Sequence, residues 1–518
     1  MFLARRLLRT DLRCLPCNRA FISEHLPVIQ VPRQAQLLAE RRSRQTGSKR
    51  VVTPQAGKLL IRTRRQELNQ PAGQTCSHWE RPELVSKGWK HRLSRGDYFI
   101  IERQTAERPG PIKTSTFQAL GLDPALVSAL SASGVNIPTW VQTQAIPTLL
   151  YGKNLLCAAE TGSGKTLSYL LPIVNQLCTG KNTSHDPLNL ILVPSRELAS
   201  QVASVARSLC TPLGLTVSVV GGGHGLVTVD RQLCKGPIDI LVATPGALWK
   251  ALKRDSVSLA SLKCIVLDEA DTLFDNSFSK LVEDILMQTR IATCEKDVHG
   301  EESKAQLVVV GATFPSGVGQ VLGKMTDLAT FATIKSKSLH YLLPHIQHKF
   351  LKVKGADKVS ELLTILKKQV AEGQGSGVLV FCNSSSTVNW LGYILDDHCV
   401  RHWRLQGNMP ASMRTGIFEA FQKGQSNVLV CTDVVSRGLD SLNVEVVVNY
   451  DFPATLQDYL HRAGRVGRLG SEKQGRVVSF VTHAWDVELV QKIEMQTRKR
   501  TSLLGTKCDI NDTVKRTL

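Results

Sequence analysis

One short stretch limits the folds open to this chain more than any other. Residues 156–172 read LCAAETGSGKTLSYLLP, an apolar run that stops at small and hydroxyl residues, places one lysine, and resumes as a helix. Glycines let such a loop turn its backbone N–H groups inward around phosphates, and the following helix adds the positive end of its dipole. The stretch predicts a phosphate-binding loop between a strand and a helix. A glycine-rich turn with a solvated lysine is the alternative interpretation.

From about residue 113, short apolar runs that end in polar or glycine-rich loops alternate with amphipathic stretches. The runs are NLILVPS, VSVVGGG, IDILVATPG, KCIVLDEAD and QLVVVGATFP, and then GVLVFCNSS, NVLVCTDV, VEVVVNYDFP and GRVVSFVT. The alternation predicts parallel sheets with helices on both faces, and a break near 335–355 predicts two such α/β domains. We expect them at 113–340 and 341–500, followed by a short tail at 501–518. The polar segment 293–306 is expected to be a surface loop.

The first 116 residues differ from the rest in charge. They hold 23 Lys or Arg and 9 Asp or Glu, whereas the remaining 402 residues hold 41 and 35. Such a segment is either a solvated tail or an arm that binds a polyanion, and nucleic acid is the commonest such partner. We interpret residues 24–112 as a basic, partly disordered extension that is flexible or folds on binding.

The beginning of the chain has the composition of a targeting segment. Residues 1–23 contain five arginines and one acidic residue, and the first four arginines share one face of a helical wheel. This pattern predicts a mitochondrial transit peptide and a matrix location. A basic RNA-binding or nuclear-targeting tail, with a nuclear or nucleolar location, is the alternative. No apolar run is long enough to cross a bilayer, so membrane insertion is not expected.

A second motif supplies the carboxylates that a phosphate site requires. In CIVLDEAD, Asp268 and Glu269 follow a buried strand. With the upstream loop, the pattern predicts that Lys165 reaches the β- and γ-phosphates and that Thr166 and Asp268 hold Mg²⁺. Glu269 would orient the attacking water, because phosphoryl transfer depends on positioned charge. An acidic cluster at a helix N-terminus is the alternative interpretation.

These motifs and eight others resemble the DEAD-box ATP-dependent RNA helicases of superfamily 2. The motifs are GVNIPTWVQ, AETGSGKT, PSRELA, GG, TPGA, DEAD, GAT, VFCN, TDVVSRGLD and HRAGRVGR, and the match covers about residues 117–483. The resemblance implies two tandem RecA-like domains, the cofactors ATP and Mg²⁺, RNA as partner, and hydrolysis of ATP to ADP and phosphate. With the arginine-rich leader, the chain looks like the mitochondrial branch of that family.

The resemblance also implies which residues contact ATP. They are Phe117, Gln142, Ala159, Glu160, Thr161, Gly162, Ser163, Gly164, Lys165, Thr166 and Asp440. A glutamine side-chain amide can pair with adenine N6 and N7, which would favour ATP. From the second domain, Arg465 and Arg468 would reach the γ-phosphate, His461 would link it to RNA binding, and Asp440 would contact the ribose. Val135 and Trp140 replace a usual aromatic and proline, which weakens the expectation of strict adenine selectivity.

A further set of positions matches family loops that hold the RNA backbone. They are Pro194, Arg196, Gly222, Thr244, Pro245, Gly246, Arg414 and Thr432. Contacts to phosphate carry no sequence information, so binding should be sequence-tolerant and salt-sensitive, and the 2′-OH would favour RNA over DNA. Four positions depart from the family pattern: Glu160, Ala247, Gly311 and Ala411.

The sequence thus predicts an RNA-stimulated ATPase that separates RNA strands locally, and a monomer when free. Ribosomal RNA or mitochondrial transcripts are the expected substrates, with assembly of the large subunit of the mitochondrial ribosome as the favoured process. An ATP-gated RNA clamp or ribosome-assembly scaffold is the second hypothesis, because Gly311 removes a hydroxyl and the arm is basic. A DNA translocase is a third, disfavoured because the motif set resembles RNA helicases.

Overall fold

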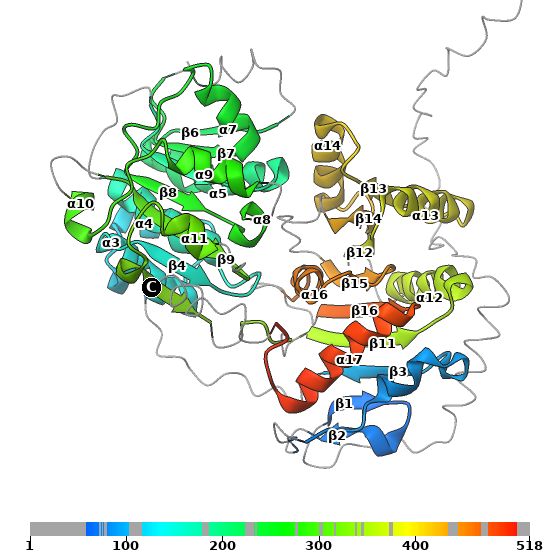
Figure 1. Ribbon diagram of the computed structural model, residues 1–518. Helices are drawn as coiled ribbons and strands as arrows, with labels where there is room; N and C mark the ends of the chain where they lie inside the picture. The colour runs from blue at the N-terminus through cyan, green and yellow to red at the C-terminus, as the bar shows by residue number, and fades with distance from the viewer. Residues whose placement is uncertain are drawn as a thin grey trace, which may run out of the picture.

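The protein forms two lobes, each built around a largely parallel sheet (Figure 1). The computed structural model describes residues 59–71, 74, 76, 80–102, 116–178, 186–222, 233, 236–274, 278–299, 304–314, 318–336, 339–342, 346–371, 377–433, 444–467 and 475–504. The predicted transit peptide and most of the predicted tail therefore lie outside the described residues. Within the described part, no helix is both long and apolar enough to cross a membrane.

The first lobe contains a seven-stranded sheet in the order β10-β4-β9-β8-β5-β7-β6, and every neighbouring pair is parallel. The strands are β4 (Leu155–Ala158), β5 (Asn189–Leu192), β6 (Val217–Val220), β7 (Ile240–Ala243), β8 (Cys264–Leu267), β9 (Gln306–Gly311) and β10 (Ala332–Lys335). Most are apolar and buried throughout, as strands covered on both faces must be. The strands predicted in this half are confirmed.

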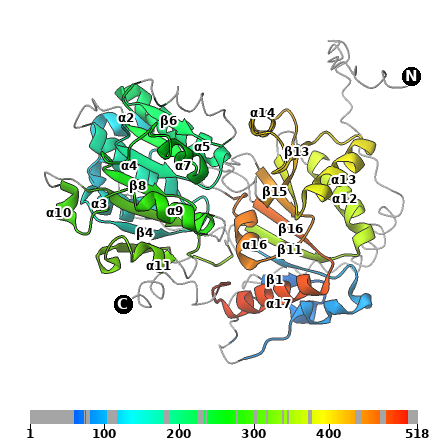
Figure 2. The same ribbon diagram turned by 45° about the horizontal axis from the view of Figure 1, so that its top comes forward.

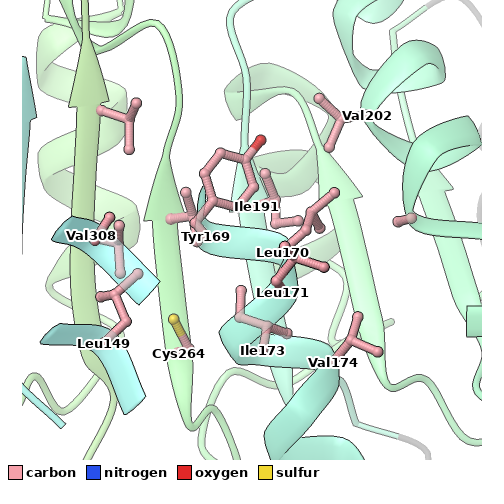
Figure 3. Close-up of a cluster of buried hydrophobic side chains, with 14 of the residues drawn as sticks. Leu149, Tyr169, Leu170, Leu171, Ile173, Val174, Ile191, Val202, Cys264 and Val308 are labelled. Carbon is pink, nitrogen blue, oxygen red and sulfur yellow. The ribbon is translucent and has the colours of Figure 1, made fainter. Parts of the chain in front are cut away.

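Helices cover both faces of this sheet and create two separate cores. They are α2 (Pro124–Ala132), α3 (Trp140–Leu150), α4 (Lys165–Leu177), α5 (Arg196–Cys210), α7 (Pro245–Leu252), α8 (Ala270–Leu273), α9 (Ser279–Leu286), α10 (Glu295–His299) and α11 (Val318–Leu322). Leu190 of β5 packs in the core that contains α7 and α9, whereas Ile191 packs with α3, α4 and α5 (Figure 3). Because successive strand residues point to opposite faces, one short strand serves both cores.

The second lobe has a nine-stranded sheet in the order β13-β14-β12-β15-β16-β11-β3-β1-β2. Six strands are parallel: β11 (Ile346–Lys352), β12 (Gly377–Cys382), β13 (Trp403–Leu405), β14 (Val428–Thr432), β15 (Val444–Asn449) and β16 (Gly475–Val481). Its helices are α12 (Lys358–Ala371), α13 (Ser385–Asp397), α14 (Ala411–Gln422), α16 (Leu456–Ala463) and α17 (Ala484–Lys499). The prediction of two α/β domains is confirmed.

The other three strands come from the segment that we interpreted as an extension. They are β1 (Leu59–Thr63), β2 (Gln70–Pro71) and β3 (Tyr98–Ile101), and β3 pairs antiparallel with β11. In two views the N-terminal strands lie beside α17, from the far end of the chain (Figure 1, Figure 2). The interpretation of 24–112 as a partly disordered extension that is flexible or folds on binding is therefore wrong for residues 59–71 and 80–102, which complete the second sheet.

Buried contacts fix this N-terminal segment on the second lobe. Phe99 stacks on Phe350 of β11 with ring centroids 4.7 Å apart. The Glu494 carboxylate of α17 accepts hydrogen bonds from the backbone N–H groups of Val85 and Ser86, at 2.8 and 3.0 Å. Arg498 pairs with the same carboxylate at 2.8 Å. A buried charge with this many donors is satisfied only when both ends of the chain meet.

Two local predictions also need correction. The segment 293–306 is not loop throughout, because α10 (Glu295–His299) lies within it and β9 begins at Gln306. The break in the strand rhythm near 335–355 contains β11 itself. In β11 polar and charged residues alternate with buried ones, which hid the strand among the continuous apolar runs.

Candidate nucleotide site and nucleic-acid interface

The order of strands in the first sheet divides the predicted site into two halves. The loops after β4, β9 and β8, which are neighbours, carry the phosphate loop, the GAT motif and the DEAD motif. The loops after β5, β7 and β6 continue along the same edge and carry PSRELA, TPG and the glycine pair. Parallel strands bring all their carboxyl ends to one edge, so nucleotide motifs and RNA motifs lie side by side.

The phosphate loop leads from β4 into α4 through two glycines with left-handed backbone. Gly162 has φ 79° and Gly164 has φ 87°, a region that L side chains rarely adopt. A Cβ at Gly164 would also lie 2.7 Å from Nε2 of Gln142, so a side chain has no room there. Lys165 begins α4 and donates to the carbonyls of Ala159 and Glu160, at 2.7 and 3.0 Å. Burial lowers the pKa of Lys165, although the facing Asp268 raises it.

Gln142 joins the helix before β4 to the phosphate loop. It is the third residue of α3 and forms a capping box with Thr139, whose N–H donates to Gln142 Oε1 at 2.9 Å. Its Nε2 donates to the Gly164 carbonyl at 3.1 Å. Val135 and Gln142 line one cavity, which residues of both lobes enclose. Phe117, in contrast, is 2% exposed in the core with α3 and α4, so its predicted adenine contact stays a prediction.

The carboxylates after β8 are held in two different ways. Asp268 accepts hydrogen bonds from the Tyr169 hydroxyl at 2.8 Å and from the Glu269 N–H at 2.9 Å. Glu269 has φ 51°, a conformation that costs about 1–2 kcal/mol in an L-residue. Its Oε2 is buried and has no hydrogen-bond partner among the residues that the structure describes. Burial raises the pKa of both carboxyls, with Arg465 opposing it at Glu269.

Asp271 connects the two lobes, and sequence reasoning did not select it. His461 Nε2 of the second lobe lies 3.0 Å from Asp271 Oδ2, and the Thr313 hydroxyl of GAT donates to the same oxygen at 3.1 Å. Burial raises the pKa of Asp271, but His461, Lys165 and Thr313 together outweigh it and lower the pKa to about 2. The signal was present in the last letter of DEAD, which we read only as part of an acidic cluster.

The second lobe reaches the phosphate loop through α16. Arg465 is 3% exposed, lines the same cavity as Lys165, and donates from Nε to the His461 carbonyl at 3.2 Å. A Cβ at Gly464 would overlap the Thr161 side chain, so the two lobes approach closely here. Arg468 and Asp440 lie outside the described residues, and their roles stay predictions.

A cavity of about 850 Å³ opens between these elements and is lined by residues of both lobes. The residues present fit a Mg²⁺–nucleoside triphosphate in three respects. Lys165 and Thr166 lie at a helix N-terminus, where anions are stabilised. Asp268 could supply the carboxylate oxygen, and Thr166 a hydroxyl oxygen, that Mg²⁺ takes beside phosphate oxygens. Glu269 keeps an unpartnered buried oxygen, which suits the orientation of a water molecule.

The predicted RNA-binding residues of the first lobe gather on the adjoining edge. Pro194 lies between β5 and α5, Arg196 begins α5, and Thr244, Pro245 and Gly246 lie at the start of α7. Arg196 Nη1 donates to the Gly222 carbonyl at 3.1 Å, which brings PSRELA and the glycine pair together. Ala247 is packed against the core and leaves this edge without a charge at that position.

On the second lobe, Thr432 ends β14 and Arg414 lies on α14. Arg414 Nε is 3.1 Å from Glu197 Oε1 of α5, a second pair between the lobes, and the side chains are 18% and 5% exposed. Sequence reasoning missed Glu197. It also missed Arg462, which is 1% exposed and binds Asp433 and Asn383, each at 2.6 Å, to hold the ends of β14 and β12 together. Both residues stood inside the quoted motifs.

Comparison with known proteins agrees with this geometry. Residues 139–321 match the DEAD/DEAH box helicase family, and residues 357–470 match the helicase conserved C-terminal domain. A mouse protein, "Probable ATP-dependent RNA helicase DDX28", is 55% identical over 504 residues, covering 94% of this chain and 93% of its own length. Its human counterpart of the same name is 54% identical with the same coverage.

Solved structures show the same fold. One, named Mss116p bound to ssRNA and AMP-PNP, matches with a TM-score of 0.66 at 23% identity, covering 78% of this chain and 80% of its own. Another, S. cerevisiae Dbp5 bound to RNA and ADP BeF3, matches with a TM-score of 0.61 at 24% identity, covering 78% of this chain and 99% of its own. These likenesses establish tandem RecA-like domains. The two family models and the identity to the mouse and human proteins show that the chain belongs to the DEAD/DEAH box helicase family.

Proposed function

We propose that this chain binds ATP with Mg²⁺ between its lobes and couples hydrolysis to local separation of RNA strands. The observation that supports this most directly is the shared cavity. Lys165 and Asp268 line it from the first lobe, and His461 and Arg465 line it from the second. A ligand that contacts both lobes favours the closed arrangement, and its hydrolysis removes that bias.

Each residue has a distinct task in this proposal. Lys165 would bind the β- and γ-phosphates, and Thr166 and Asp268 would hold Mg²⁺, which neutralises charge on the phosphate oxygens. Glu269 would orient the attacking water through its unpartnered oxygen. Arg465, together with Arg468, would stabilise charge on the γ-phosphoryl group, because a guanidinium stays ionised at every relevant pH.

The RNA face would act through the backbone rather than the bases. Small residues and helix N-termini at PSRELA, TPG and the glycine pair allow close approach of phosphates. Arg414 and Thr432 would hold the same strand from the second lobe. Arg414 also faces Glu197 of the first lobe. The same arginine would therefore take part both in closure of the lobes and in RNA binding.

The separation of the lobes tests the proposal. Cys294 and Cys399 are exposed thiols on different lobes, so dyes can be attached there after the other reactive cysteines are replaced by serine. Energy transfer should rise when a non-hydrolysable ATP analogue and an oligoribonucleotide are added together, and Lys165→Ala should abolish the rise. Equal transfer with and without these ligands would contradict the proposal.

An ATP-gated RNA clamp or ribosome-assembly scaffold is the second candidate, and one observation favours it. A Cβ at Gly311 would lie 2.9 Å from the Thr313 carbonyl oxygen, so the backbone of GAT is adapted to glycine and leaves no room for a hydroxyl-bearing side chain. A duplex-unwinding assay beside an ATP-dependent RNA-retention assay separates the two functions. Retention without unwinding would favour the clamp. Stronger binding of an RNA strand than of the matched DNA strand, measured in competition, would exclude a DNA translocase.

We further propose a mitochondrial location and ribosomal RNA as substrate, from the arginine-rich residues 1–23 and from the family resemblance. A reporter fused to these residues should enter the matrix, and accumulation in the nucleus or nucleolus would favour the alternative. Crosslinking in cells and sequencing of the attached RNA should recover large-subunit ribosomal RNA. Recovery of other mitochondrial transcripts would redirect the proposal to them.

A further inference from the structure

Tyr169 stands one turn beyond the residues that begin α4. It follows Lys165 by four positions and Thr166 by three, so the three side chains share one face of the helix. Its side chain is fully buried, and its ring lies among the apolar side chains between α4 and the sheet (Figure 3). A phenylalanine ring would fill the same space, so the hydroxyl needs a separate explanation.

The partners of this hydroxyl both belong to the nucleotide site. The phenol donates to Asp268 Oδ2 at 2.8 Å, and the Thr166 side chain also hydrogen-bonds with the phenol. Asp268 Oδ1 accepts from the Glu269 N–H at 2.9 Å. Each oxygen of the Asp268 carboxylate therefore has a donor, and the plane of the carboxylate is fixed from two sides.

We propose that Tyr169 is a positioning residue for magnesium, because its hydroxyl orients Asp268 and Thr166 toward the place where the ion binds. Burial of a hydroxyl destabilises a protein unless the hydroxyl is hydrogen-bonded, and here both partners are residues proposed to hold the metal ion. Partners of this kind, behind a metal ligand, typically change metal affinity 10–100-fold when they are removed. The inference rests on the proposed function, since it names a residue that serves the same site.

The test is Tyr169→Phe in the full chain. Binding of a fluorescent ATP analogue is measured across a series of Mg²⁺ concentrations and in EDTA. The Mg²⁺ concentration at half of the metal-dependent gain in affinity should rise about 10–100-fold. Affinity in EDTA should stay as in the parent protein, which shows that the variant is folded and that the phosphate loop is intact.

Tyr459→Phe is the matched control. Tyr459 is also fully buried, and its hydroxyl is hydrogen-bonded to His348 Nδ1 at 2.9 Å in the second lobe, away from the metal ligands. This variant loses a comparable buried hydrogen bond, so it should be destabilised to a similar degree. Its Mg²⁺ dependence should equal that of the parent protein.

The outcomes separate this inference from the proposed function. Unchanged Mg²⁺ dependence in Tyr169→Phe, with a clear shift in Asp268→Asn, would overturn the role of Tyr169 and leave the proposed function standing. Equal loss of affinity in EDTA and in Mg²⁺ would also overturn it. If the parent protein gains no affinity from Mg²⁺, the proposed function itself fails. In the double variant, the Tyr169→Phe shift should vanish; full additivity with Asp268→Asn would contradict shared action.

Discussion

His461 Nε2 lies 3.0 Å from Asp271 Oδ2, and this pair joins the two lobes at the edge of the nucleotide cavity. Both side chains are buried, with exposed fractions of 9% and 0%. Asp271 also accepts a hydrogen bond from Thr313, so three motifs distant in the sequence meet at one carboxylate. Any change in this carboxylate is felt by both lobes.

Loss of the pair should weaken closure. Leaving a buried carboxylate without its partner costs about 2–5 kcal/mol, so His461→Ala should lower RNA affinity in the presence of a non-hydrolysable ATP analogue by roughly 30-fold or more. RNA affinity without nucleotide should be unchanged, because the proposed function needs this pair only when bound nucleotide favours closure of the lobes. Titration of a labelled oligoribonucleotide with and without the analogue measures both values.

Asp271→Asn provides the partner variant for a double-mutant cycle. If the two side chains act through each other, the double variant should be scarcely worse than either single variant. Strictly additive losses would show that His461 and Asp271 contribute to closure independently.

Gly464→Ala should block the close approach of α16 to the phosphate loop. The backbone of Gly464 has φ −70°, which alanine accepts, but its Cβ would overlap the Thr161 side chain. Overpacking of this kind costs about 1–3 kcal/mol, which corresponds to about 5- to 150-fold slower RNA-stimulated hydrolysis. Nucleotide binding without RNA should be unaffected, because Thr161 meets Gly464 only across the lobes.

Gly355→Ala is the control for this prediction. A Cβ at Gly355, in the same lobe, meets nothing within 4 Å, so turnover should stay normal. Equal turnover in Gly464→Ala and the parent protein would mean that the approach to Thr161 is not needed for hydrolysis.

The pH dependence of hydrolysis should reflect Glu269. Burial raises the pKa of Glu269 from its ordinary value of 4.5, and burial raises that of Asp268 as well. A carboxyl with a raised pKa loses its charge at a higher pH during acidification, so turnover should fall with a midpoint above 4.5. The rate of RNA-stimulated ATP hydrolysis, measured across the acid range, gives this midpoint.

Glu269→Gln removes the titrating group. This variant should still bind ATP and RNA, but its turnover should fall by about 10²–10⁴-fold, the usual contribution of a general base. Normal turnover in Glu269→Gln, or a midpoint at or below the ordinary glutamate value in the parent protein, would contradict the assigned role.

Two N-terminal deletions should behave differently. Residues 1–58 carry twelve Lys or Arg against three Asp or Glu, so their removal should lower RNA affinity and flatten its salt dependence. Removal of residues 1–112 also takes away buried Trp89 and Phe99 and uncovers the edge of β11. Because loss of one such aromatic side chain costs about 3–5 kcal/mol, the second lobe should unfold at a much lower temperature.

Thermal unfolding and RNA titration of both deletions check this prediction. The same unfolding temperature for the two deletions would contradict the structural role of β1 and β3. Unchanged RNA affinity at physiological salt after loss of residues 1–58 would refute the proposed role of the basic arm.

Local patterns in the sequence were sufficient to predict the phosphate loop and buried strands of both sheets. Glycine at 162 and 164, one lysine, and an apolar run on each side define a phosphate loop because backbone freedom and helix dipoles act over a few residues. Buried strands of both sheets were also predicted from local patterns, since a short continuous apolar run between polar loops is typical of a strand that is covered on both faces.

Tertiary structure alone decided the contacts between remote segments. Glu494 finds its donors at Val85 and Ser86, more than 400 residues away, and Asp271 finds His461 in the other lobe. The hydroxyl of Tyr169 indicates a role at the metal site only because the fold places Asp268 beside it. Such pairs depend on the order of strands and on the closure of the lobes. Neither can be predicted from the residues that flank a side chain in the sequence.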